Sequence, residues 1–211
     1  MSNVSVPAER PSIYLASKSS RRQELLRQLG VDFTQLLMRE AAGRKRDIVE
    51  TPRENEPPRE YIQRLARTKA SFGWEVMGKR GLAPKPMLGA DTEVVQDGAV
   101  FGKPKDAADA MEMLRRLSAS THEVSTAVAI RWNTQIIIRV SSSRITFREL
   151  TADEINRYVA SSEPFDKAGA YAIQGRGAAF VSHLEGSYSG VMGLPLFETA
   201  EILAKIGFPV T

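Results

Sequence analysis

Short apolar runs alternate along this chain with longer stretches that have helical periodicity. Residues 12–16 and 87–95 are apolar runs of the length that predicts a buried strand. Residues 122–131 and 134–147 predict two longer strands, and in the first of them β-branched residues alternate with small ones. The Asp-Gly pair at 97–98 favours a tight type I′ turn, which predicts a hairpin directly after the second run.

Five other stretches have apolar residues at spacings of three and four, as in helices that pack on one side. Ser20 with Gln23, and Thr151 with Glu154, have the spacing of a capping box and are predicted to open two of these helices. Because strands and helices are mixed along the chain, the sequence predicts an α/β fold with a mixed sheet. The five helices are predicted to begin near Ser20, Pro57, residue 106, Thr151 and Pro195.

Two regions lack clear periodicity. Residues 39–56 are polar and charged, which predicts a loop, and the basic stretch 39–47 within them has no assigned role. Residues 163–194 are rich in glycine, with strands expected only at 170–173 and 178–182. No linker separates independent parts, so a single domain spanning the whole chain is expected.

Composition describes an ordinary globular protein. The 211 residues are 42% hydrophobic and 26% charged, which suits a chain with a real core. The absence of cysteine excludes a disulfide scaffold, a thiolate metal site and a cysteine nucleophile. Residues 1–11 lack the features of a secretory signal and are expected to be flexible, and no apolar stretch is long enough to span a bilayer. A cytoplasmic protein without a membrane partner is therefore expected.

The formal net charge of +4 has two interpretations. It reflects either a mildly basic surface or a set of basic residues that converge on an anionic ligand. No recognisable nucleic-acid module or aromatic-interleaved basic patch is present, so nucleic acid is not expected as a partner. The two histidines cannot form a histidine-rich metal site, and His122 is expected to be structural.

The first candidate for chemistry lies between the first strand and the first helix. Free N–H groups at a helix start attract phosphate, which makes Ser17 and Ser19 candidate contacts. Arg21 and Arg22 follow and can each bind a phosphate through two N–H groups. The alternative is an ordinary helix cap followed by solvated arginines.

The second candidate is Asp91, followed by Thr92, in the strand that runs from residue 87. A carboxylate at a strand end can hold a divalent cation and orient a water molecule, although it can also simply cap a turn. A second carboxylate nearby would complete a site for a hard cation. On sequence alone, that acid can be any one of Glu40, Asp47, Glu50, Glu54 or Glu56.

The remaining candidates are two lysines and an amide. Lys103, between Gly102 and Pro104, either approaches a phosphate or lies in a surface turn, and no Walker motif is present. In the glycine-rich region, Lys167 offers a cation and Gln174 an amide that suits the edge of a base. A glycine-rich connection with solvated charges is the alternative.

Taken together, these segments resemble the Maf family of nucleotide pyrophosphatases. The motifs occur in family order over nearly the whole chain. Three departures stand out: Ser20 replaces the usual proline, Val49 replaces the aspartate before Glu50, and residues 39–47 look like a short insertion. The motifs are LASKSSRR (15–22), YIQRLARTKA (61–70), GADTEVV (89–95), FGKP (101–104), MLRRLSASTHEVSTAV (113–128), EPFDKAGAYAIQGRGAAFV (163–181) and GSYSGVMGLPLFET (186–199).

The resemblance implies an elongated mixed sheet flanked by helices, with two lobes and a central cleft, as in Maf and inosine-triphosphatase-like proteins. It implies hydrolysis of a nucleoside triphosphate to the monophosphate and pyrophosphate with Mg²⁺ or Mn²⁺, and it leaves a homodimer open. Asp91 and Glu50 are the implied metal ligands. The implied catalytic residues are Asp91, Lys69 and Lys103, and the implied substrate contacts are Ser17, Ser19, Arg21, Arg22, Thr92, Lys167 and Gln174.

Two branches of the family differ in the base they prefer. One favours dTTP and UTP, and Arg21, Thr92 and Gln174 match it. The other favours 7-methyl-GTP and carries a tryptophan at the position of Arg21. The resemblance thus favours a dTTP and UTP pyrophosphatase. The alternatives are the 7-methyl-GTP type and a nucleotide-binding regulator of septum formation with little turnover.

Overall fold

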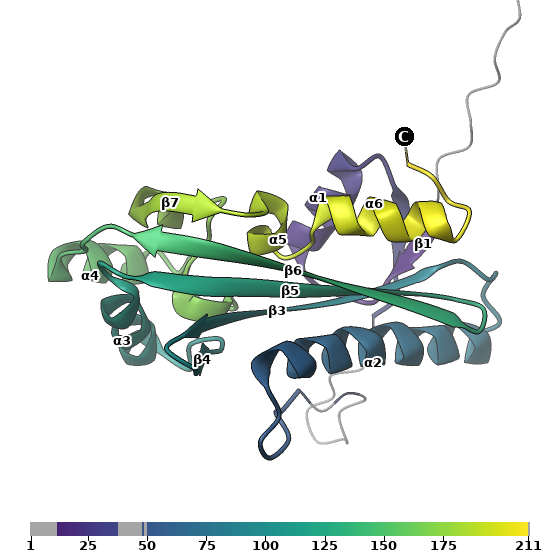
Figure 1. The fold of residues 1–211 in the computed structure, drawn as a ribbon, viewed down its shortest axis with the longest axis horizontal. Coiled ribbons are helices and arrows are strands. Elements are labelled where there is room, and N and C mark those ends of the chain that lie inside the picture. The colour runs from purple at the N-terminus through teal and green to yellow at the C-terminus, as the bar shows by residue number, and fades with distance from the viewer. Residues whose placement is uncertain (1–11, 38–47, 49, 211) are drawn as a thin grey trace, which may run out of the picture.

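The fold is built on seven strands that form one mixed sheet. The structure is a computed structural model that describes residues 12–37, 48 and 50–210. The sheet order is β2-β1-β3-β5-β6-β7, with β4 paired to β3, and β1 is parallel to both of its neighbours while the other pairs are antiparallel. This confirms the predicted α/β fold with a mixed sheet (Figure 1). The strands are β1 Ser12–Leu15, β2 Asp32–Gln35, β3 Met87–Gln96, β4 Ala99–Phe101, β5 Thr121–Trp132, β6 Gln135–Phe147 and β7 Val181–Glu185.

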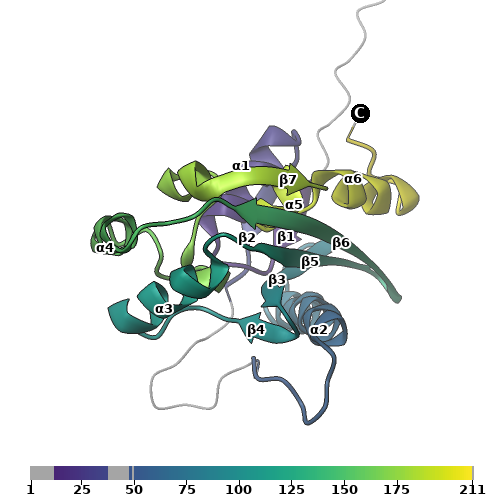
Figure 2. The same cartoon turned by 60° about the vertical axis from the view of Figure 1, so that its left-hand side comes forward.

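Helices cover both faces of the sheet. The long helix α2 lies on one face, where Ile62, Ala66 and Ala70 pack against Ala127 and Ala129 of β5. The other α-helices contribute to the core on the opposite face, and Figures 1 and 2 show α1 and α6 there, across the sheet from α2. The helices are α1 Ser20–Gln28, α2 Pro58–Lys79, α3 Ala107–Leu117, α4 Ala152–Ala160, α5 Tyr188–Met192 and α6 Leu196–Lys205, with 3₁₀ turns at Ala168–Ala170 and Arg176–Phe180.

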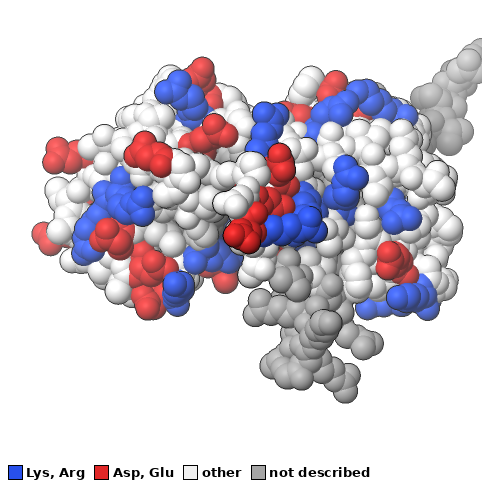
Figure 3. Space-filling model, turned by 60° about the horizontal axis from the view of Figure 1, so that its bottom comes forward, with Lys and Arg blue, Asp and Glu red and all other residues white. Residues whose placement is uncertain are grey.

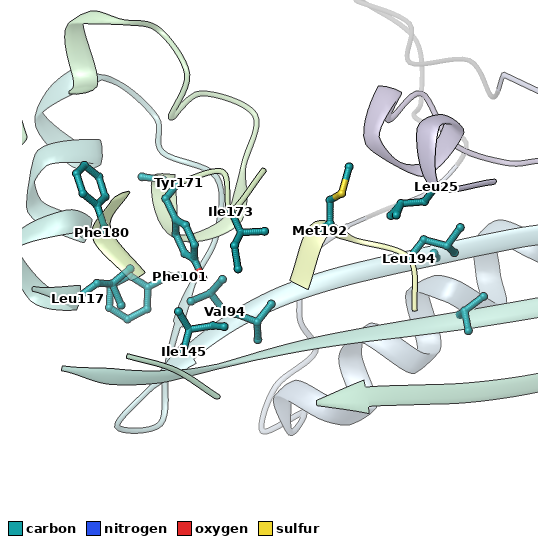
Figure 4. Packing of buried hydrophobic residues seen from close by; sticks show 14 of the residues in the cluster. Leu25, Val94, Phe101, Leu117, Ile145, Tyr171, Ile173, Phe180, Met192 and Leu194 are labelled. Carbon is teal, nitrogen blue, oxygen red and sulfur yellow. The ribbon is translucent and has the colours of Figure 1, made fainter. Parts of the chain in front are cut away.

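One continuous apolar core runs along the sheet face opposite α2. At one end, Leu25, Met192 and Leu194 pack together, and at the other Tyr171 lies against Phe101 (Figure 4). Both groups rest on the same long strands, β3 and β5. The sheet therefore joins two lobes, as the resemblance implies, instead of ending between them.

The neighbours of β3 leave part of its edge unpaired. β1 pairs with β3 only as far as Leu15 and Leu88, after which the Ala16 N–H still reaches the Leu88 carbonyl at 2.8 Å. β4 pairs with β3 only from Val94 onward. Among the described residues, no strand pairs with this edge between Leu88 and Val94, so the sheet is open beside the predicted site residue Asp91.

Several local predictions are confirmed. Residues 97–98 form the predicted hairpin turn, with φ of 49° and 77°. Thr151 and Glu154 make the predicted capping box at the start of α4. The second predicted capping box is wrong. Ser19 is the cap of α1, because its backbone is extended and its hydroxyl accepts from the Arg22 N–H at 3.4 Å.

Other local predictions failed in the glycine-rich region and at the sheet edge. The strand expected at 170–173 is absent, because a 3₁₀ turn ends at Ala170 and a tight turn follows it. The strand expected at 178–182 begins only at Val181, after a second 3₁₀ turn. Neither β2 nor the short helix α5 was predicted. The expectations for residues 1–11 and 39–47 fall outside the described residues. Within the described part of the chain, no helix is long and apolar enough to cross a membrane.

His122 is buried in the core, as predicted for a structural residue. Only 2% of it is exposed, its Nε2 lies 2.9 Å from the Tyr171 hydroxyl, and its ring meets Phe147 edge-on. Burial lowers the pKa of His122 to about 4, because the charged imidazolium loses its hydration there. The folded protein therefore keeps this ring neutral at pH values where an unfolded chain protonates it.

This difference predicts a loss of stability in acid. Since the unfolded chain takes up the proton near pH 6.5 and the folded protein only near pH 4, the free energy of unfolding should fall across this window by about 3 kcal/mol. His122→Gln should reduce the dependence of the unfolding free energy on pH in this window, as measured by urea unfolding at several pH values. His183→Gln, at an exposed position on β7, is the control and should leave the slope unchanged. Equal slopes for His122→Gln and the parent would contradict the assignment.

Candidate active site

A cleft of about 1080 Å³ opens beside the unpaired edge of β3, and both lobes line it. Its walls come from the loop after β1, the start and middle of α2, β3, the loop after β4 and the glycine-rich region. The structure brings all eleven predicted site residues to this one cleft. They are Ser17, Ser19, Arg21, Arg22, Glu50, Lys69, Asp91, Thr92, Lys103, Lys167 and Gln174.

An ammonium group that bridges two carboxylates forms the centre of the cleft. Lys69 Nζ lies 2.6 Å from Asp91 Oδ1 and 2.7 Å from Glu50 Oε1. The Lys69 side chain is 11% exposed and that of Asp91 16%, so this pair is shielded, whereas Glu50 is 47% exposed. Burial alone would raise the pKa of Glu50, but Lys69, with Lys103 and Arg22 farther off, holds it below its ordinary value. Glu50 is therefore an anion at neutral pH.

This contact depends on how closely α2 lies on β3. Gly89 faces α2 two residues before Asp91, and a Cβ there would lie 2.5 Å from the Ala66 carbonyl oxygen and 2.6 Å from the Ala70 nitrogen. The same Cβ would lie 2.9 Å from the Lys69 Cβ. Only glycine lets the helix backbone come this near, and that distance lets Lys69 reach Asp91.

Arg22 is fixed on the other side of β3 by three hydrogen bonds. Its Nε donates to the Gly193 carbonyl at 2.8 Å, Nη1 donates to Ser17 Oγ at 3.2 Å, and Nη2 donates to Thr92 Oγ1 at 3.3 Å. Burial lowers the pKa of Arg22, and the nearby Asp91 charge opposes this. These bonds use three of the five guanidinium N–H groups, so the rest of the fork can bind an anion.

Thr92 holds this arginine through a hydrogen-bond chain. Thr126 donates its proton to the Gly190 carbonyl at 2.7 Å, so in the 2.8 Å contact between the two threonine hydroxyls Thr92 is the donor. Its oxygen then accepts from Arg22. Thr92 was predicted as a substrate contact, and in this structure its hydroxyl links Arg22 to α5 and β5.

Further cations line the cleft, Arg21 from the start of α1 and Lys167 from the glycine-rich region. Burial lowers the pKa of Arg21, with Asp166 opposing, and burial followed by the nearby Arg21 charge lowers the pKa of Lys167. Lys167 Nζ donates to the Glu163 carbonyl at 2.6 Å, which fixes its position in the loop. Lys103 is exposed in the loop after β4. Gln174 is likewise exposed at the cleft.

The structure separates the candidate loop acids. Glu56 binds Arg64 at 2.6 Å and is thus committed to a pair outside the central contact. Glu54 is exposed and does not line the cleft. Glu40 and Asp47 lie outside the described residues. Glu50 alone of the described candidates contacts Lys69.

Sequence reasoning missed Glu93, a buried acid that also lines the cleft. It is 4% exposed, and its Oε2 has no hydrogen-bond partner among the described residues. Burial, followed by the charges of Asp91 and Glu123, raises the pKa of Glu93 to about 7. The signal was present in the sequence, because residues two apart on a strand point to the same face.

The cleft is thus lined by both acidic and basic side chains, and neither positive nor negative charge dominates it. The same mixture extends over the face shown in Figure 3, where Lys and Arg side chains lie next to Asp and Glu near its middle. No group of three or more His, Cys, Asp or Glu residues that could hold a metal gathers within the described residues. Any cation here would need ligands from a substrate or water in addition to protein carboxylates.

The sequence of this chain is similar to those of known proteins. The family described as Maf-like protein matches residues 12–206. The chain belongs to the Maf family. A protein of Nitrosospira multiformis called "dTTP/UTP pyrophosphatase" is 54% identical to this Maf protein over 193 residues, which are 92% of this chain and 93% of the relative. Its counterpart of the same name from Nitrosomonas europaea is 50% identical over 198 residues, 94% and 96% of the two chains.

The close contact at Gly89 can be tested in the Maf protein by adding one methyl group. Gly89→Ala should lower the free energy of unfolding by about 1–3 kcal/mol, because backbone atoms of α2 must move to admit the Cβ. Gly78→Ala, in α2 itself, is the control, since nothing lies within 4 Å of its added Cβ, and it should raise stability by about 0.5–1 kcal/mol. Urea unfolding measures both, and unchanged stability in Gly89→Ala would refute the required close approach.

Proposed function

We propose that this protein hydrolyses dTTP and UTP to the monophosphate and pyrophosphate in the cleft beside β3. The observation that carries the proposal is the pairing of Lys69 with Asp91 and Glu50, opposite the cations Arg21 and Arg22. Such a site offers carboxylates that can activate water and cationic side chains that can bind a triphosphate. The names of the relatives, about half identical over nearly their full length, support the same reaction.

A divalent cation, Mg²⁺ or Mn²⁺, fits the donors of this site. Asp91 and Glu50 supply hard carboxylate oxygens, and both lie against the same ammonium group, so they are close enough to share one ion. Two carboxylates completed by phosphate oxygens and water are a usual Mg²⁺ site. When bound, the cation neutralises charge on the phosphates and favours pyrophosphate as a leaving group.

The chain's own residues carry the rest of the reaction. Lys69 occupies Asp91 Oδ1, so we assign Oδ2 to the attacking water, whose proton Asp91 accepts. The water oxygen bonds to the α-phosphorus, the bond from that phosphorus to the bridging oxygen breaks, and pyrophosphate leaves. Arg22 and Lys103 stabilise negative charge on the phosphate oxygens. No covalent intermediate on the protein is needed.

Base choice rests on the lobe that carries Gln174. An amide can both donate to and accept from the edge of a pyrimidine, and Gln174 is exposed at the cleft where a base can approach. Arg21 supplies a rigid donor fork nearby, while Thr92 acts through Arg22. A site that selects by hydrogen bonds disfavours ligands that leave its polar groups unpaired.

The activity is tested with a panel of nucleotides and metals. Purified protein with Mg²⁺ or Mn²⁺ should release pyrophosphate from dTTP and UTP, with kcat/KM at least about tenfold above that for 7-methyl-GTP. EDTA should abolish turnover if the carboxylates hold a required cation. Release of orthophosphate would refute the mechanism, preference for 7-methyl-GTP would assign the other branch, and tight binding without turnover would favour a regulator.

The acids are tested by removing charge without changing shape. Asp91→Asn should lower kcat by about a hundredfold or more, since it removes the group that accepts the proton. Glu50→Gln should lower activity sharply and raise the metal concentration needed for half-maximal rate. Glu54→Gln, an exposed acid of the same loop, is the control and should change little. If Glu40→Gln proved the damaging change, the choice of Glu50 would be wrong.

A further inference from the structure

The turn that carries Gln174 is held from both ends. The Gly175 N–H donates to the Ala172 carbonyl at 3.1 Å, which closes a four-residue turn with Ile173 and Gln174 at its corners. Ile173 is 6% exposed and belongs to the core that includes Tyr171 (Figure 4). Gln174, in contrast, is exposed at the cleft. The turn therefore has one anchored corner and one that faces the cleft.

Two polar side chains fix the residues on either side of these corners. The Tyr158 hydroxyl accepts from the Ala172 N–H at 3.1 Å and donates to Glu163 Oε1 at 2.9 Å. The same carboxylate accepts from the Arg176 N–H at 3.1 Å through Oε2 and from the Gly177 N–H at 3.1 Å through Oε1. One tyrosine–glutamate pair thus joins the first residue of the turn to the two residues that follow it.

Two glycines make this arrangement possible. A Cβ at Gly175 would lie 2.5 Å from Glu163 Oε1 and 2.6 Å from Oε2. A Cβ at Gly177 would lie 2.8 Å from both the Tyr158 hydroxyl and the Ala172 carbonyl oxygen. The chain therefore wraps against the polar pair more closely than any residue with a side chain allows.

Glu163 also fixes a cation of the cleft. Its main-chain carbonyl accepts from Lys167 Nζ at 2.6 Å, while its carboxylate holds the turn. Burial alone would raise the pKa of Glu163, but the N–H groups of Arg176 and Gly177 and the Tyr158 hydroxyl keep it below its ordinary value. The carboxylate is thus ionised, and all three groups donate to it.

We propose that Glu163 and Tyr158 are positioning residues for substrate selection: they fix the turn Ala172–Gly175 so that the Gln174 amide meets the edge of a pyrimidine base. This inference rests on the proposed function and extends it to residues outside the cleft's predicted contacts. Glu163 touches no reacting atom. Its effect reaches the substrate through the backbone of the turn, so it should appear in base recognition and leave phosphate chemistry intact.

The test separates the base from the phosphates. Two substrates are compared, dTTP and the 5′-triphosphate of deoxyribose without a base. Glu163→Gln places an amide NH₂ against groups that donate, which should loosen the turn and lower kcat/KM for dTTP by about tenfold, mainly through KM. For the base-free triphosphate, the kcat/KM of the variant should stay within about twofold of that of the parent. An equal fall for both substrates would overturn the proposal.

Two further variants control for stability. Tyr158→Phe removes only the hydroxyl and keeps the ring that packs on Phe180. It should therefore lower the ratio of kcat/KM for dTTP to kcat/KM for the base-free triphosphate, even if Glu163→Gln folds poorly. Glu154→Gln removes an acid that also accepts several hydrogen bonds, from Thr151 and Arg148, at the far end of α4. It should reduce stability without changing the ratio. A changed ratio in Glu154→Gln would mean that lost stability alone explains the effect.

A double-mutant cycle then tests whether Glu163 acts through Gln174. Gln174→Ala should itself lower the preference for dTTP over the base-free triphosphate. In that background, Glu163→Gln should change the ratio by less than about twofold, because the group it positions is gone. Additive effects of the two substitutions would refute the positioning role.

Hydrogen exchange keeps this inference separate from the proposed function. Amides in residues 172–177 should exchange faster in Glu163→Gln and Tyr158→Phe than in the parent and in Glu154→Gln, with no nucleotide present. If the parent released no pyrophosphate from dTTP, the proposed function would fail whatever the exchange result. If the parent were active but exchange and selectivity were unchanged in both variants, only the positioning role would fail.

Discussion

The buried ammonium of Lys69 ties together three of the segments that line the cleft: α2, β3 and the segment before α2. An ammonium group is strongly hydrated, and with only 11% of the Lys69 side chain exposed most of that water is removed. Two carboxylates compensate, one from β3 and one from the segment before α2. Without the cation, Asp91 and Glu50 would face each other as like charges. Strand, helix and loop are thus held in register by one shared charge, and Gly89 is needed because it lets that charge reach its partners.

Much of the fold could be predicted because its long elements have clear periodicity. The hairpin at 97–98, the capping box of α4 and the buried face of α2 follow from local rules about turns, caps and spacing. Shorter elements escaped for physical reasons. β2 is four residues, DFTQ, with alternating exposure and little apolar signal, and the five-residue α5 is too short to show a period. The cap of α1 was misplaced because neighbouring serines look alike until backbone conformation distinguishes them.

The site was predictable as a set of residues and less so as a set of roles. Individual motifs were ambiguous, but their shared order along the chain pointed to one cleft, and all the predicted residues line it. Roles depend on contacts between distant segments, which no local pattern contains. Thr92 was expected to contact substrate because it matches the dTTP and UTP branch of the family, yet its hydroxyl is committed to Thr126 and Arg22. Glu163 gave no sign of its contacts, because those depend on the close return of Gly175 and Gly177.

The continuity of the sheet beneath both lobes limits how the cleft can adapt. β5 and β6 pair without interruption from Thr121 with Thr146 to Trp132 with Gln135, so the two walls share a backbone. A cleft between domains that are joined by a linker can close as a hinge, with whole walls rotating as bodies. Here such a rotation would have to bend a hydrogen-bonded ladder. Ligands of different size must therefore be accommodated by loops and side chains above a nearly fixed floor, and the spacing between the two walls is set by strand geometry.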